Sequence, residues 1–236
     1  MKYFIIAGVA LLLFSCQETK SEGNLHITGS IKGLKKGTLY IQKIVDTSLV
    51  AIDTIEIDGD PEFTSNLTIE SPEMYYLFLD RGVTNSLDNN LPFFAEAGNI
   101  NLETSLEHFL SDARITGSKN HDKYAEFKKV TTRFNDRNLD LMETKFNAFK
   151  LKNPKTIDSI EALQDTNLKR RYLYTTNFAI TNHDFEVAPF VTLSEIPNVS
   201  LKYLDTIQQS LTPKVAQSFY GKKLIKFYKE RKKGGQ

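Results

Sequence analysis

The sequence predicts an α+β protein: an antiparallel, β-sandwich-like N-terminal domain at residues 24–116, followed by an α-helical region at residues 117–236. Two observations support this prediction. As far as Thr116, apolar residues alternate with polar ones between frequent turn residues, which is typical of antiparallel sheets and sandwiches. From Ser118 onward the apolar residues recur every three or four positions, which is the period of a helix.

The N-terminal domain is expected to hold strands at residues 25–31, 38–44, 50–57, 62–69, 74–79, 92–95 and 100–103. Asp58-Gly59 stands between two alternating runs, and an Asp-Gly step in that position predicts a β-hairpin joining 50–57 to 62–69. The polar segment 80–90 is long enough to be a binding loop, but a plain surface loop is the favoured interpretation.

The helical region opens with polar N-cap candidates at residues 118–122. One face of the first helix should carry Tyr124, Phe127, Val130 and Phe134, and a second stripe with 3,4,3 spacing follows at Leu139, Met142, Phe146 and Phe149. The step of five residues between the two stripes predicts a bend around residues 136–138. Apolar stripes of this kind are mostly core, so we expect both to be buried.

Pro154 should end the first helix, and a second should begin near Thr156. Shorter helices are expected at residues 188–196 and 200–211, and a last one from Pro213 or Ser218 to about Lys232. That last helix is basic. Its cations either contact acidic lipid headgroups or another anionic partner, or belong to an ordinary solvated helix end, which is the favoured interpretation.

The single cysteine, Cys16, follows a segment typical of a bacterial lipoprotein signal peptide at residues 1–15. Lys2 is its charged start and residues 3–14 are apolar, a run of 12 where a membrane-spanning helix needs about 20. An ordinary secretory signal would want a small residue at Leu13. We therefore expect lipid attachment at Cys16, a polar tether at residues 16–23, and a protein anchored in the cell envelope at the outer membrane, on its periplasmic face or at the cell surface.

Charge and composition exclude several function classes. The chain has 30 Lys+Arg against 29 Asp+Glu, so it lacks the basic excess of a nucleic-acid-binding protein. With Cys16 carrying lipid, no thiol remains for a C-x-x-C pair, a cysteine nucleophile, a disulfide or a zinc ligand. We expect no nucleic-acid partner.

The histidines give a weak metal hypothesis. His121-Asp122 and His183-Asp184 fit a metal-dependent phosphohydrolase, but no H-x-x-x-H or H-E-x-x-H occurs, and helix capping is the favoured role of these carboxylates. A carboxylate pair for glycoside hydrolysis stays open, because the separation of the two groups is a three-dimensional property. We therefore expect no metal, no cofactor, no catalytic residue and no enzyme activity.

Several short segments occur in the order found in one bacterial family. They are Ile27-Thr28-Gly29-Ser30-Ile31, Glu96-Ala97-Gly98-Asn99-Ile100, Ile115-Thr116-Gly117-Ser118, Val187-Ala188-Pro189-Phe190 and Phe219-Tyr220-Gly221-Lys222-Lys223-Leu224. In them the chain resembles the domain of unknown function 4369 family, the N-terminal domain of bacterial lipoprotein thiol-disulfide oxidoreductases. Typical members continue into a thioredoxin-like domain with a C-x-x-C site, whereas this sequence ends at about the point where that domain would start.

The resemblance implies the anchored N-terminal part of such a protein without its catalytic part. The function expected from the sequence is therefore a membrane-anchored envelope lipoprotein that acts as a binding or accessory module for an envelope protein or a small ligand. The alternative is a non-catalytic component of a thiol-disulfide redox system. A hydrolase with an unrecognised site is a third hypothesis.

Overall fold

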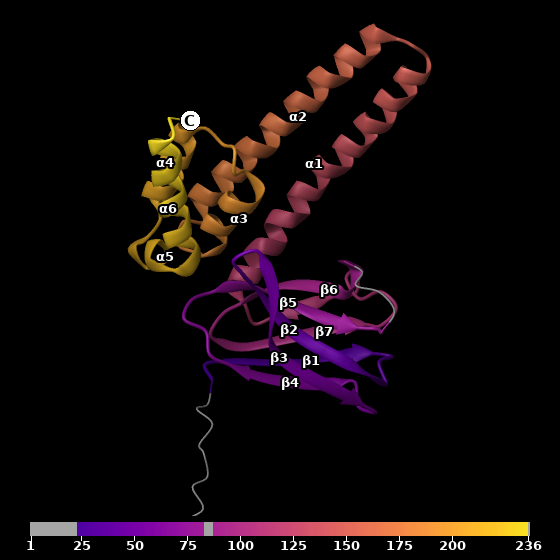
Figure 1. Cartoon of the computed structure of the whole chain (residues 1–236), viewed down its shortest axis with the longest axis vertical. Helices are drawn as coiled ribbons and strands as arrows, with labels where there is room; N and C mark the ends of the chain where they lie inside the picture. Colours follow the sequence, from indigo (N-terminus) through magenta and orange to yellow (C-terminus); the bar gives the residue numbers. More distant parts are fainter. Residues whose placement is uncertain (1–22, 83–86, 236) are drawn as a thin grey trace, which may run out of the picture.

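The computed structural model describes residues 23–82 and 87–235 and has the predicted α+β architecture, with two four-stranded sheets followed by helices (Figure 1). The strands are β1 Leu25–Lys32, β2 Lys36–Val45, β3 Ser48–Asp58, β4 Glu62–Leu67, β5 Glu73–Asp80, β6 Asn90–Ala95, β7 Gly98–Ser105 and β8 Arg114–Thr116, and the 3-10 helix η1 covers Leu87–Asn89. The helices are α1 Lys119–Lys150, α2 Pro154–Thr181, α3 Val187–Glu195, α4 Leu201–Ser210, α5 Pro213–Gln217 and α6 Phe219–Lys233.

The two sheets have the strand orders β4-β1-β7-β8 and β3-β2-β5-β6. Neighbouring strands are antiparallel except β1 and β7, which pair in parallel from Leu25↔Gly98 to Lys32↔Ser105. The inward-facing residues of both sheets form one hydrophobic core, which includes Leu25, Ile27, Ile31, Leu39, Ile41, Leu77, Leu79, Phe93, Ile100 and Leu102. Removing this apolar surface from water is the main force that holds the sheets together.

The Asp58-Gly59 turn does not form the expected hairpin. β3 pairs with β2, from Lys36↔Asp58 to Val45↔Ser48, whereas β4 pairs with β1 in the other sheet. Gly59, at φ +96°, lies in the turn that carries the chain from one sheet to the other. Ile57 and Phe63, on either side of the turn, are both buried in the shared core, so alternation alone could not distinguish a hairpin from a crossing.

Helix α1 begins with Ser118, whose Oγ accepts a hydrogen bond from the His121 backbone N–H at 3.0 Å. It runs unbroken to Lys150, through residues 136–138, where a bend was expected. A step of five residues turns the apolar face by roughly 140° around a helix of 3.6 residues per turn, which needs no break. The face that includes Phe127 packs against α2, where Phe127 contacts Tyr174 and Phe178.

The second apolar stripe of α1 is exposed, and the expectation that it belongs to the core is wrong. Exposed fractions are 63% for Leu139, 53% for Met142, 59% for Phe146 and 57% for Phe149. Leu141 and Ala148, on an adjacent face, instead contact Ile157 and Ile160 of α2. We call the four exposed residues the apolar stripe.

The α1–α2 hairpin projects from the β-sandwich as a long arm, and α3 to α6 lie beside its base (Figure 1). These shorter helices have their own core, which includes Ala188, Ile196, Leu204, Ile207, Val215 and Leu224. A third buried cluster joins sandwich and helices, because Met74 and Phe94 from the sheet pack against Phe127, Phe178, Val187 and Val191. The arm is therefore braced at its base by tertiary packing.

Candidate functional site

Cys16, the expected lipid-attachment residue, lies outside the described residues, as do the expected signal peptide at 1–15 and most of the tether at 16–23. Part of the connection at 80–90 is outside them as well. The described residues offer three other regions where function can be sought: the polar junction between sandwich and helices, the arm, and the basic last helix.

The junction is organised around Glu96, in the turn between β6 and β7. Its Oε1 accepts a hydrogen bond from the Lys119 backbone N–H at 2.6 Å, and its Oε2 accepts one from the Asn120 backbone N–H at 3.4 Å. These donors belong to the first turn of α1, where N–H groups lack partners within the helix and a negative charge is favoured. Glu96 thus holds the start of the arm to the sheet.

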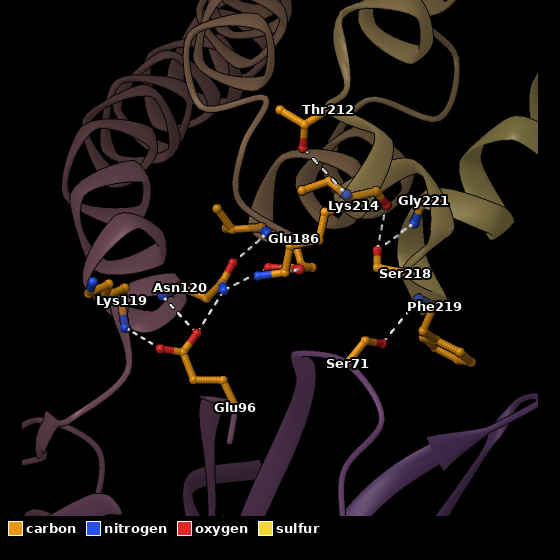
Figure 2. A network of polar contacts seen from close by, with 12 residues as sticks. Ser71, Glu96, Lys119, Asn120, Glu186, Thr212, Lys214, Ser218, Phe219 and Gly221 are labelled. Atoms are coloured by element: carbon orange, nitrogen blue, oxygen red, sulfur yellow. Dashed lines mark hydrogen bonds and ion pairs between the residues drawn. The ribbon is translucent and has the colours of Figure 1, made fainter. Parts of the chain in front are cut away.

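Asn120 extends this contact to α3 (Figure 2). Its Nδ2 donates to Glu96 Oε2 at 2.7 Å and to Glu186 Oε2 at 3.0 Å, and its Oδ1 accepts from the Val187 N–H at 2.9 Å. Asn120, Glu186 and Val187 are all buried. One amide therefore joins two carboxylates and the beginnings of two helices.

A second seam joins the sandwich to α6 (Figure 2). Ser71 Oγ accepts from the Phe219 N–H at 3.1 Å, and the hydroxyl of Tyr220 accepts from the Met74 N–H at 3.1 Å. Burial raises the pKa of Tyr220, and burial raises the pKa of Tyr124, whose ring contacts the same Phe94 and Phe190, to about 12. Both phenols stay neutral at physiological pH, as suits a packing role.

A polar cleft of about 580 Å³ opens at the junction. It is lined by residues that include Ser71, Glu96, Asn120, Asp184, Glu186 and Lys214. Lys214 is exposed, and its Nζ lies 3.9 Å from Glu186 Oε1. Because Glu96 and Glu186 already accept hydrogen bonds from Asn120 and the α1 backbone, their chemistry here is to hold helices in place.

His121 and His183 have separate hydrogen-bond partners. His121 Nδ1 accepts from the Phe94 N–H at 3.4 Å, and burial lowers its pKa. His183 contacts the Ile180 carbonyl at 2.9 Å, near the end of α2 rather than at a helix start. Over residues 23–82 and 87–235, no group of three or more His, Cys, Asp or Glu side chains is placed to hold a metal ion.

The arm carries the main apolar surface of the helical region. Besides the apolar stripe, a groove of about 610 Å³ runs between α2 and the α3–α4 connection near the arm's base. Its lining includes Leu168, Tyr172, Leu173, Val199 and Tyr203. Exposed large apolar patches on a folded protein mark interaction surfaces more often than catalytic ones.

The basic last helix is partly engaged by the fold. Arg231 donates from Nη1 to the Pro197 and Val199 carbonyls at 3.0 and 2.6 Å, and Lys226 lies 3.8 Å from Glu230. Lys222, Lys226, Lys229 and Lys233 line a shallow, solvent-open groove. Arg231 is thus held against the α3–α4 connection, whereas these four lysines are exposed.

Sequence reasoning missed the junction residues Glu96, Asn120 and Glu186. Asn120 stood among the polar N-cap candidates at 118–122, but its partners are 24 and 66 positions away in the chain. No local pattern marks such a contact.

In the described part of the chain, no helix is long and apolar enough to cross a membrane. Residues 25–124 match the family model described as Domain of unknown function (DUF4369). The match covers the whole sandwich and the first six residues of α1. No curated protein and no solved structure matches the chain.

Proposed function

Because the chain carries a DUF4369 domain joined to a helical arm, we propose that it is a lipid-anchored bacterial envelope protein that acts as a non-catalytic binding or accessory module. Lipid at Cys16 holds it to the outer membrane, on the periplasmic face or at the cell surface. The arm presents the binding surface. The observation that carries this proposal is the exposed apolar stripe on a helix braced at its base.

The stripe is costly to leave in water. Its four side chains expose apolar surface on the order of 400 Å², comparable to the largest apolar patch on a typical monomer, which is often functional. Their 3,4,3 spacing places them on one side of α1, so they can meet a partner together. The inner face of the same helix is already occupied by α2.

The hydrogen bonds at the junction are a second observation that supports a binding role. Its carboxylates, which would be the first candidates for acid–base chemistry, accept hydrogen bonds from helix starts and from Asn120. They join the sandwich to the helices, so that the arm is held in a defined direction from the domain that follows the anchor.

Site-specific photo-crosslinking in cells tests the proposal. A photoreactive phenylalanine analogue replaces Phe146 in the stripe, and the matched control carries it at Leu110, which is 40% exposed in the sandwich. We expect adducts from position 146 that are absent from position 110 and reduced in a Cys16→Ala chain. Equal adducts at both positions, or none at 146, would contradict the proposed surface.

The alternative role, a non-catalytic component of a thiol-disulfide redox system, follows from the DUF4369 match together with the resemblance described above. It predicts that the adduct at position 146 contains a separate thioredoxin-like lipoprotein. It also predicts that deletion of the gene shifts the thiol redox state of envelope proteins. An unchanged redox state would remove this alternative and leave the binding role in place.

A further inference from the structure

We propose that the tip of the α1–α2 hairpin, residues 144–157, docks onto a lipid bilayer surface that carries anionic headgroups. We call this segment the hairpin tip. The inference rests on the proposed role of the arm as the binding element, and it names the partner of the arm's far end.

The hairpin tip combines positive charge with exposed apolar side chains. It contains four lysines, Lys145, Lys150, Lys152 and Lys155, and no aspartate or glutamate. Phe146 and Phe149 of the apolar stripe are exposed, and Leu151, at the end of α1, is 79% exposed. Lysines interleaved with aromatic and aliphatic side chains are the composition that binds the headgroup region of an anionic bilayer.

The backbone holds these side chains in a fixed arrangement. The Lys152 N–H donates to the Phe149 carbonyl and the Asn153 N–H to the Ala148 carbonyl, both at 3.0 Å, which is the double hydrogen bond of a Schellman helix end. Asn153 then caps α2 by accepting from the Thr156 N–H at 3.3 Å. The tip is thus a tight turn that loses little conformational freedom on docking.

The lysines lie close to the rings. Lys150 Nζ is 4.3 Å from the centre of the Phe146 ring, and Lys145 Nζ is 6.0 Å from that of Phe149 while also 2.8 Å from Glu161 Oε1. At a bilayer the aliphatic stems follow the rings to the acyl boundary, and the ammonium groups reach the phosphates. Both kinds of side chain are then satisfied at once.

Charge argues against a second copy of this chain as the partner. Residues 119–181, which form the arm, hold 13 Lys+Arg and 8 Asp+Glu. Pairing two arms, in either direction, would bring two net positive surfaces together, whereas an anionic bilayer neutralises them.

Vesicle binding tests the proposal. The chain used in this experiment comprises residues 16–236 with Cys16→Ala. It contains every described residue of the fold and carries no lipid. The probes are vesicles of phosphatidylcholine alone and of phosphatidylcholine mixed with phosphatidylglycerol. We expect binding to the mixed vesicles only, weakened by added salt.

Two triple variants distinguish binding through the hairpin tip from binding through positive charge in general. K150Q/K152Q/K155Q should weaken binding about a hundredfold, at roughly fivefold per lysine. K226Q/K229Q/K233Q removes the same charge from α6 and should change binding by less than about threefold. Equal loss in both variants, or unchanged binding of the tip variant, would overturn the proposal.

A spectroscopic readout is available because the chain has no tryptophan. Phe149→Trp should shift its fluorescence to shorter wavelength on the mixed vesicles, and Tyr203→Trp, in the groove at the arm's base, should not. If the fluorescence of Phe149→Trp is already at shorter wavelength without vesicles, and sedimentation shows a dimer, the proposal is overturned in favour of a second copy of this chain as the partner. If vesicles fail to bind while crosslinking from position 146 persists, the binding role stands and the bilayer assignment falls.

Discussion

Replacing Asn120 by leucine tests whether the junction joins the sandwich to the helices. The variant keeps the approximate size of the side chain and removes all three of its hydrogen bonds, to Glu96, Glu186 and the Val187 N–H. Glu96 retains the donors of the α1 backbone. Glu186 and Val187 are buried and lose the partner that Asn120 provided.

The expected cost is about 3–5 kcal/mol, because each buried group left unpaired costs about 1–3 kcal/mol and a charged one costs more. Urea unfolding followed by circular dichroism measures this loss. The matched control is Asn101→Leu, which removes two exposed hydrogen bonds, one with Thr28 and one with Glu103, and should cost less than about 1 kcal/mol. A loss below about 1 kcal/mol for Asn120→Leu would refute the reasoning.

Asn120→Asp should change the folding stability by an amount that depends on pH. The introduced carboxylate lies beside Glu96 and Glu186, so like charge raises its pKa in the folded state above the unfolded value. An acid with a raised folded pKa is destabilising above its unfolded pKa, and the penalty shrinks as pH falls. The stability difference from the parent chain should therefore narrow from about pH 7 toward about pH 4. A difference that is independent of pH would show that the three groups do not interact.

Three further predictions follow from the described contacts. Phe127→Ala should cost about 3–5 kcal/mol because the ring is fully buried, whereas Phe146→Ala should cost less than about 1 kcal/mol; equal losses in urea unfolding would mean that the apolar stripe is core. Burial lowers the pKa of His121, so below the unfolded value of about 6.5 the unfolded chain binds more protons and stability falls. His121→Gln should flatten this loss between about pH 7 and about pH 5, and an unchanged slope would assign it to other groups. Lys152, at φ +49°, lies in the left-handed region, so Lys152→Gly should raise the free energy of unfolding by up to about 1 kcal/mol; a decrease would contradict the strain argument.

The sequence carried much of the fold because local periodicity reports which face of each element is apolar. Alternation located the seven expected strands, and only the short β8 was added by the structure. The change to helical spacing after Thr116 placed α1 at Lys119. Asn153-Pro154 marks the turn between α1 and α2, since proline has no N–H to continue a helix.

Which strands pair with one another could not be predicted from periodicity in the same way. The alternation of β3 and β4 is satisfied whether they pair with each other or with strands of two facing sheets, and the structure has the second arrangement. The packing of Ile57 and Phe63, together with the inward-facing residues of both sheets, into one shared core favours the crossing.

By itself, the sequence determined the α+β class, the order of the elements, and a single cysteine behind an apolar N-terminal run. The tertiary structure decided which apolar faces are covered and which distant polar groups meet. Leu139, Met142, Phe146 and Phe149 have the spacing of a core stripe, yet α2 covers the neighbouring face of α1 and leaves them in solvent. Asn120 contacts Glu96 and Glu186 because the sheet and the helices pack together at the junction. Contacts between residues so far apart in the chain depend on that packing rather than on local propensity.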